Sequence, residues 1–237
     1  MSGLDGANET TLLGGGVHAP VWAPSGDRLV YQRSGSRGGI SMVQMDGSIT
    51  DVTTPDLIAG RPEFSRDGQW IYFHAWEDDD SRRRIFRVRP DGSGLEELGL
   101  GLYPTPSPDG RSVAWTTTSG ELVIHDLAAG TERVLPGITN ADAPRWSPDG
   151  AWIAYTTRLG GDLMLVRPDG TESRRIDRES LIYGISWSPD SRWIIGNSWR
   201  FMIVDVSTGL MAALPLRGGR PCLAPVALAA EPGAALH

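Results

Sequence analysis

The side chains best suited to acid–base chemistry or metal binding are the histidines, which lie far apart in the chain. They are His18, His74, His125 and His237, and no two of them have the spacing of a zinc-binding helix. His74 and His125 stand in separate strand-like segments, so they could meet at a metal only through the fold. The sequence therefore favours structural histidines and predicts no metal site and no cofactor.

Several common covalent mechanisms lack their residues. All 22 basic residues are Arg, which excludes a Schiff-base lysine and the lysine of a phosphate-binding P-loop. Residues 196–200 read GNSWR, which is not the Gly-x-Ser-x-Gly nucleophile elbow. Cys222 is the only cysteine, so the chain has no intramolecular disulfide and no cysteine zinc site. These observations favour a protein without enzymatic activity.

Charged residues gather in residues 74–86, HAWEDDDSRRRIF, where four acidic side chains precede three arginines. A calcium loop would need alternating oxygen ligands and a glycine at the sharp turn, and this stretch has neither. We expect a lengthened hairpin loop whose opposite charges neutralise each other, or a loop that contacts a partner. Arg89 and Arg167 each open an Arg-Pro-Asp-Gly turn, and we expect both to be solvated.

Net charge and hydropathy limit the partners and the location. The formal charge is -7, whereas nucleic-acid binders carry a clustered basic surface, so we expect a protein, a peptide or a small molecule as partner. The first residues lack a basic and then apolar leader, and no apolar stretch is long enough for membrane insertion. The sequence as written predicts a cytoplasmic protein, or a periplasmic or extracellular one if the N-terminus is incomplete.

The chain repeats one turn five times. Aromatic-Ser-Pro-Asp-Gly or a variant of it places a turn residue at intervals of 42, 42, 40 and 41 residues, at Gly26, Gly68, Gly110, Gly150 and Ser191. A second turn follows each one after about 20 residues, with short β-branched or aromatic segments between them. This period predicts four-stranded antiparallel blades stacked around an axis, which is a β-propeller.

The residues before and within each turn have separate tasks. Pro fixes φ, Asp bonds the backbone ahead of it, and Gly tolerates positive φ. The aromatic residues that precede the turns are expected to wedge between neighbouring sheets; they are Trp22, Phe64, Trp146 and Trp187. A four-stranded sheet cannot bury both apolar faces alone, so the repeat is first of all architectural.

These repeats resemble the TolB-like β-propeller, a relative of the WD-type repeat family. The resemblance covers about residues 17–219 and implies an all-β propeller with five recognisable repeats. The predicted units are 17–58, 59–101, 102–140, 141–181 and 182–219. Residues 1–16 are predicted as the outer strand of a preceding or closing blade, and residues 220–237 as an atypical Ala- and Pro-rich tail. The sequence leaves open five blades closed by the N-terminal strand, an incomplete sixth blade, or an altered C-terminus.

In a propeller, the loops that connect successive blades lie on one face, around the mouth of the channel. The positions that begin each blade there are polar or aromatic residues of different types; they are His18, Arg61, Tyr103, Asp142 and Tyr183. Because loops on a rigid scaffold often carry function, we predict that these residues form a binding surface.

The sequence favours a non-enzymatic platform that binds a protein or peptide through this surface, with the oligomeric state left open. One alternative is a metal-dependent sugar lyase or lactonase-type propeller, for which only His18 and Asp142 are obvious ligands. Another is a propeller domain detached from a larger peptidase or sensor.

Overall fold

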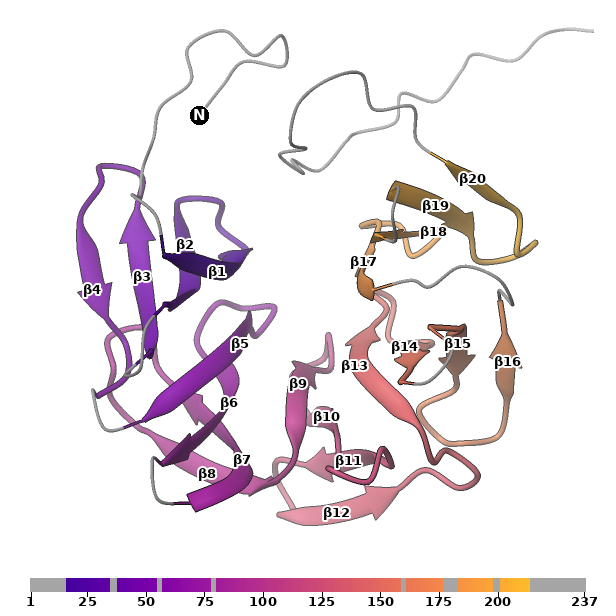
Figure 1. The fold of residues 1–237 in the computed structure, drawn as a ribbon, viewed down its shortest axis with the longest axis horizontal. Helices are drawn as coiled ribbons and strands as arrows, with labels where there is room; N and C mark the ends of the chain where they lie inside the picture. The colour runs from indigo at the N-terminus through magenta and orange to yellow at the C-terminus, as the bar shows by residue number, and fades with distance from the viewer. Residues whose placement is uncertain are drawn as a thin grey trace, which may run out of the picture.

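The computed structural model describes residues 16–34, 38–54, 57–77, 80–158, 161–176, 183–197 and 201–213. Side chains 77, 80, 81, 183 and 197 are not among the described parts. The regular structure of these residues consists of twenty strands in five antiparallel sheets of four. The sheets stand around a common axis, so the predicted all-β propeller is confirmed (Figure 1).

Each sheet is one blade, and its strands follow in chain order. Blades 1 and 2 consist of β1 (Val17–Trp22), β2 (Arg28–Arg33), β3 (Ile40–Gln44), β4 (Ile49–Asp51), β5 (Ile58–Phe64), β6 (Ile71–Glu77), β7 (Asp80–Val88) and β8 (Glu96–Leu100). Blade 3 consists of β9 (Leu102–Pro106), β10 (Ser112–Thr116), β11 (Leu122–Asp126) and β12 (Thr131–Val134). Blades 4 and 5 consist of β13 (Ala141–Trp146), β14 (Ile153–Thr157), β15 (Leu163–Val166), β16 (Ser173–Arg175), β17 (Tyr183–Trp187), β18 (Trp193–Asn197), β19 (Phe201–Asp205) and β20 (Met211–Ala213).

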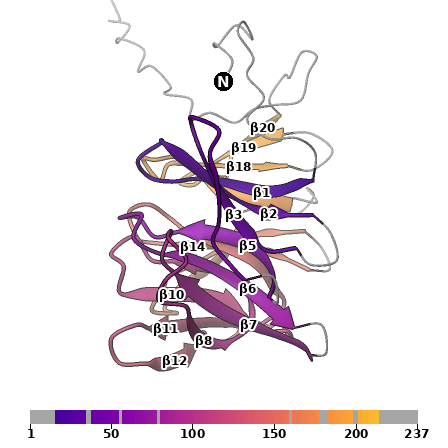
Figure 2. The same cartoon turned by 90° about the vertical axis from the view of Figure 1, so that its left-hand side faces the viewer.

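The first strand of each blade faces the axis and the fourth lies at the rim (Figure 1). Successive first strands contact one another from β1 to β5, β9, β13 and β17. Figure 2 shows the ring from its side, where the sheets of the first three blades follow one another. The residues predicted as an outer strand (1–16, apart from Gly16) and as a tail (220–237) lie outside the described residues.

Four clusters of buried hydrophobic side chains fill the four junctions between successive blades. Neighbouring strand residues point to opposite faces of a sheet. Trp115 therefore packs toward blade 2 with Tyr72, whereas Ala114 packs toward blade 4 with Tyr155. Each inner sheet thus buries both faces, which explains why an isolated blade could not fold alone.

Three of the four predicted wedge residues pack at these junctions, namely Phe64, Trp146 and Trp187. Each packs against the preceding blade. The prediction is wrong for Trp22, which is 38% exposed, because blade 1 has no preceding blade among the described residues.

The repeated turn is closed by side-chain hydrogen bonds, as blade 3 illustrates. Ser107 Oγ donates to Asp109 Oδ1 at 2.6 Å and accepts the N–H of Ser112 at 2.9 Å. Asp109 Oδ1 also accepts the N–H of Arg111 at 3.0 Å, and Gly110 adopts a φ of 71°. The bond from Ser107 is the largest cause that lowers the pKa of Asp109.

The expected loop within residues 74–86 is mostly strand. β6 and β7 continue to Glu77 and from Asp80, so only residues 78–79 separate them. The prediction of a lengthened loop is therefore wrong, because the clustered charges concealed the extended, alternating conformation of this hairpin. Arg83 within it lies over the ring of Trp76, 3.6 Å from its centroid.

Arg89 is exposed as expected, and the Arg167 side chain is 38% exposed, but each also lies over an indole ring. Arg89 lies over the ring of Trp70 at 4.5 Å, and Arg167 over that of Trp152 at 3.9 Å. A guanidinium is planar and weakly hydrated, so it can lie over an indole while part of it stays in water.

No helix in the described parts of the chain is long and apolar enough to cross a membrane.

Candidate functional site

The first strand of every blade carries a β-bulge near its beginning, where its pairing with the second strand shifts. One residue at each bulge has positive φ; these residues are Ala19 (46°), Arg61 (54°), Tyr103 (56°), Ala143 (46°) and Gly184 (59°). Each lies seven residues before the turn residue of its blade. A non-glycine residue in this conformation costs about 1–3 kcal/mol and is typical of functional sites.

The bulge shows that the five predicted residues occupy two positions instead of one. Arg61 and Tyr103 stand at the bulge itself, whereas His18, Asp142 and Tyr183 stand one residue earlier. Adjacent strand residues differ in direction, so the predicted residues could not all point to one place. The side chain of Tyr183 lies outside the described parts, although its backbone begins β17.

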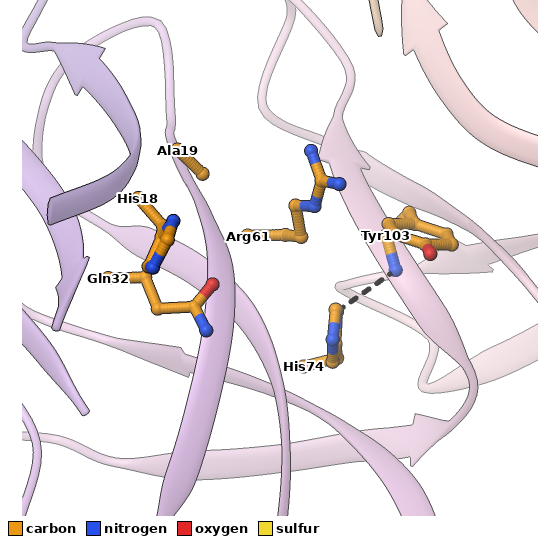
Figure 3. A pocket seen from close by; sticks show the side chains of 6 residues that line it. All are labelled: His18, Ala19, Gln32, Arg61, His74 and Tyr103. Carbon is orange, nitrogen blue, oxygen red and sulfur yellow. Dashed lines mark hydrogen bonds between the residues drawn. The ribbon is translucent and has the colours of Figure 1, made fainter. Parts of the chain in front are cut away.

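Three of the predicted residues meet at one cavity of about 590 Å³, which blades 1, 2 and 3 enclose. Its lining residues are His18, Ala19, Gln32, Arg61, His74 and Tyr103. In Figure 3, His18 and Gln32 stand on one side, His74 and Tyr103 on the other, and the Arg61 side chain between them. We call this cavity the mouth cavity.

His74 is a buried, neutral hydrogen-bonding group in the mouth cavity. Its side chain is 7% exposed, and its Nδ1 accepts the backbone N–H of Tyr103 at 3.3 Å. Burial, together with the charges of Arg83 and Arg61, lowers the pKa of His74 to about 4. At neutral pH the ring therefore carries its proton on Nε2, which is a donor.

Arg61 supplies the positive charge of the mouth cavity. Its guanidinium lies 5.7 Å from the ring centroid of Tyr103. Among the described residues, no carboxylate lies within ion-pair distance of Arg61. The charge of Asp142 interacts with that of Arg61 from beyond ion-pair distance.

Asp142 lines a second cavity of about 440 Å³, which adjoins the first because Tyr103 lines both. Burial raises the pKa of Asp142, although Arg158 and Arg61 act in the opposite direction. Arg158 lies 3.9 Å from the Asp142 carboxylate and donates to the carbonyls of Thr117 and Thr118. Arg83 and Leu102 complete this cavity, which we call the side cavity.

Sequence reasoning missed Gln32 and interpreted His74 as structural, although a signal for both is present. Six residues after each turn residue, the second strand carries a polar side chain; the set is Gln32, His74, Thr116, Thr156 and Asn197. Thr116 and Thr156 bond the carbonyls of Leu102 and Asp142 at 3.4 Å. A polar residue at one register of every blade indicates a polar layer around the channel.

The prediction that the chain has no metal site stays a prediction, and the geometry bears on it only for the described residues. Within them, no group of three or more His, Cys, Asp or Glu could hold a metal ion. His18 and His74 share the mouth cavity, but the Nδ1 of His74 already accepts a hydrogen bond.

The other end of the channel is aromatic. A cavity of about 570 Å³ there is lined by all four aromatic residues that precede the turns, and by prolines. Arg145 lies 3.6 Å from Glu63 there, and Arg66 donates to the carbonyl of Pro148 at 2.7 Å.

Comparison with known sequences agrees with this architecture. A family model described as the TolB beta propeller domain matches residues 6–191. An uncharacterized protein of Agrobacterium fabrum, Atu1656, is 30% identical over 56% of this chain and 52% of its own length. A TolB homolog of Chlorobium luteolum is 32% identical over 54% of this chain and 32% of its own length. The chain thus spans about half of the first relative and a third of the second.

Solved structures share the fold at low identity. A putative TolB from Agrobacterium tumefaciens superposes with a TM-score of 0.71 and 21% identity, over 83% of this chain and 79% of that one. An oligogalacturonate lyase in complex with manganese superposes with a TM-score of 0.66 and 15% identity, over 85% of this chain and 65% of that one. Because the family model covers most of the chain and the five blades carry its repeat, the chain belongs to the TolB β-propeller domain family.

Proposed function

We propose that this chain is a non-enzymatic platform that binds a protein or peptide at the mouth of its channel. The observation that carries the proposal is the mouth cavity, where three blades present different polar side chains on strained backbone. Clefts of about 300–1,000 Å³ with a few convergent polar groups are typical binding sites. The adjoining side cavity extends this surface, as an elongated ligand would require.

The fold is also compatible with the alternative function of a metal-dependent lyase, because a manganese-bound lyase has the same fold at 15% identity. In this chain the described residues offer two histidines at the mouth, which is fewer ligands than catalytic metal sites use. A role as the propeller of a longer peptidase or sensor is compatible with the platform and stays a proposal.

A peptide selection tests the platform. A displayed library of random peptides is selected against the immobilised full chain, and affinities are measured for the chain and two variants. The mouth variant changes Arg61, Tyr103 and Asp142 to Ala. The control variant changes Arg111 and Asp91, which lie beside turns at the other ends of the strands, to Ala.

We expect peptides that bind the parent and the control equally and lose at least tenfold affinity for the mouth variant. Equal binding to all three folded proteins would contradict the proposal. A thermal shift with Mn²⁺ or Ca²⁺ that disappears in His18→Ala and His74→Ala would instead support the metal-dependent alternative, since a ligand at ~100 times its Kd adds about 2.7 kcal/mol.

A further inference from the structure

The geometry points to a carboxylate group of the bound peptide as the feature that the mouth cavity recognises, with Arg61 and the Nε2–H of His74 as its donors. This inference rests on the proposed function and names the chemistry of the partner.

The charge of Arg61 is the first support. Its guanidinium lines the cavity beside Tyr103 and, among the described residues, has no acid within ion-pair distance. A guanidinium presents its N–H groups in a planar fork that matches a carboxylate in two parallel hydrogen bonds. Arg61 is exposed to solvent at the bulge of β5, so its N–H groups are accessible to such a ligand.

The donor on His74 is the second support. The backbone N–H of Tyr103 occupies Nδ1, which leaves Nε2–H as the free donor of a neutral ring. The amide of Gln32, the ring of His18 and the hydroxyl of Tyr103 line the same cavity (Figure 3). A cation beside several hydrogen-bond donors suits an anion.

The charge balance favours a singly charged anion over a phosphate. Arg158 in the side cavity is already committed to Asp142 and two carbonyls, and Arg83 lies over Trp76. Asp142 lies close enough for its charge to interact with Arg61. Asp142 repels any anion at Arg61, but it repels a dianion about twice as strongly as a carboxylate, so a singly charged group is favoured.

The shape of the site favours a carboxylate carried by a peptide. Tyr103 lines both cavities, so they lie next to each other on the face of the channel mouth. A terminal residue or an acidic side chain would occupy the mouth cavity, and the preceding residues would run toward Leu102 and Thr118.

The test follows the ring signals of the full chain, labelled with ¹³C at histidine Cε1, by NMR. The probes are an acetylated tetra-alanine with a free C-terminus, the same peptide amidated, the amidated peptide ending in Glu, and free acetate and galacturonate. His74→Gln and His125→Gln assign the signals. The variants are Arg61→Gln and, as a control of equal charge change, Arg111→Gln on the exposed first turn of blade 3.

We expect saturable shifts of the His74 signal with the peptide that ends in a free carboxylate or in Glu, and none at His125. Amidation or Arg61→Gln should weaken binding at least tenfold, and Arg111→Gln should leave it unchanged. The peptide that binds more tightly shows whether the carboxylate comes from a C-terminus or from a side chain.

The remaining outcomes separate this inference from the platform. If the plain amidated peptide binds equally well, or Arg61→Gln has no effect, carboxylate recognition is wrong while the platform stands. If acetate and galacturonate bind with dependence on Arg61 and no peptide does, carboxylate recognition stands and the platform is wrong. If no probe produces saturable shifts, this inference is overturned, and the peptide selection alone decides the platform.

Discussion

The two ends of the channel are built by the same five strands but use the repeat differently. At the turn end, Ser65, Ser107, Ser147 and Ser188 each donate to an Asp two residues later. At the mouth end, each blade has a bulge of similar φ, but the residues there are Ala, Arg, Tyr, Ala and Gly. The turn end repeats the same side chains from blade to blade, whereas the mouth end repeats only the backbone conformation.

This difference separates the demands of the fold from those of a ligand. A hairpin turn needs similar chemistry from blade to blade, so its residues recur in blades 2 to 5, whereas blade 1 has Ala23 at the serine position. A bulge needs only an unusual backbone angle, which glycine supplies most easily, as Gly184 does in blade 5. Arg61 and Tyr103 adopt that angle at a cost that Ala19 and Ala143 share, so the strain belongs to the blade repeat and only the side chains differ from blade to blade.

The largest effect is expected from breaking the scaffold at a blade junction. Trp115 is completely buried, and a side chain on Gly101 would collide with its indole. Trp115→Ala should lower the free energy of unfolding by about 3–5 kcal/mol, because a large cavity would remain. Trp22→Ala, at a 38% exposed indole, should cost less than about 1 kcal/mol. Urea unfolding measures both, and equal costs would contradict the junction model.

A repeated turn should contribute less, and in a manner that depends on pH. Ser107→Ala removes two hydrogen bonds and should cost about 1–2 kcal/mol at pH 6. The bond from Ser107 lowers the pKa of Asp109 below its ordinary value of 3.8 in the folded state. Its stabilisation is therefore complete above pH 3.8 and is lost as the pH falls through the folded pKa. The difference between parent and variant should shrink between pH 5 and pH 2.5, and a difference that grows there would refute this role.

At the bulge of a first strand, replacing alanine by glycine should not lower the free energy of unfolding as it does elsewhere in a strand. Ala143→Gly relieves a positive φ of 46°, so we expect stability to be unchanged or raised by up to about 1 kcal/mol. Ala154→Gly, in the buried interior of β14, should instead cost about 1 kcal/mol. Denaturant unfolding of both variants checks this, and equal losses would show that the bulge is not strained.

The smallest effect concerns the charge beside the mouth cavity. Asp142→Asn removes a negative charge that interacts with Arg61, so carboxylate peptides should bind about two- to fivefold more tightly. Asp91→Asn, at a distant exposed turn, should leave their affinity unchanged. The NMR titration described above measures both, and weaker binding to Asp142→Asn would mean that Asp142 contacts the peptide directly.

The sequence was sufficient for the architecture because each blade repeats the same turn at a nearly constant interval. It was insufficient for the direction of single side chains. A bulge adds one residue to the strand, so Asp142 and Tyr103 appeared equivalent although they occupy adjacent positions. The absence of a histidine motif predicts a structural His74, and its place in the mouth cavity depends on the backbone N–H of Tyr103, which comes from another blade. Counting back from the turn residue of each blade shows that Asp142 and Tyr103 occupy adjacent positions. Counting forward shows that His74 stands at the same position as Gln32.

The mouth cavity has a mechanical consequence because no single blade forms it. His18 comes from blade 1, Arg61 and His74 from blade 2, and Tyr103 from blade 3. A ligand bound there would contact three blades at once. Separating these blades would then require breaking the contacts of the ligand in addition to those of the two junctions. Ligand binding would therefore slow amide hydrogen exchange along β1, β5 and β9 together. Binding at the mouth cavity would thus reduce local opening in all three of these blades.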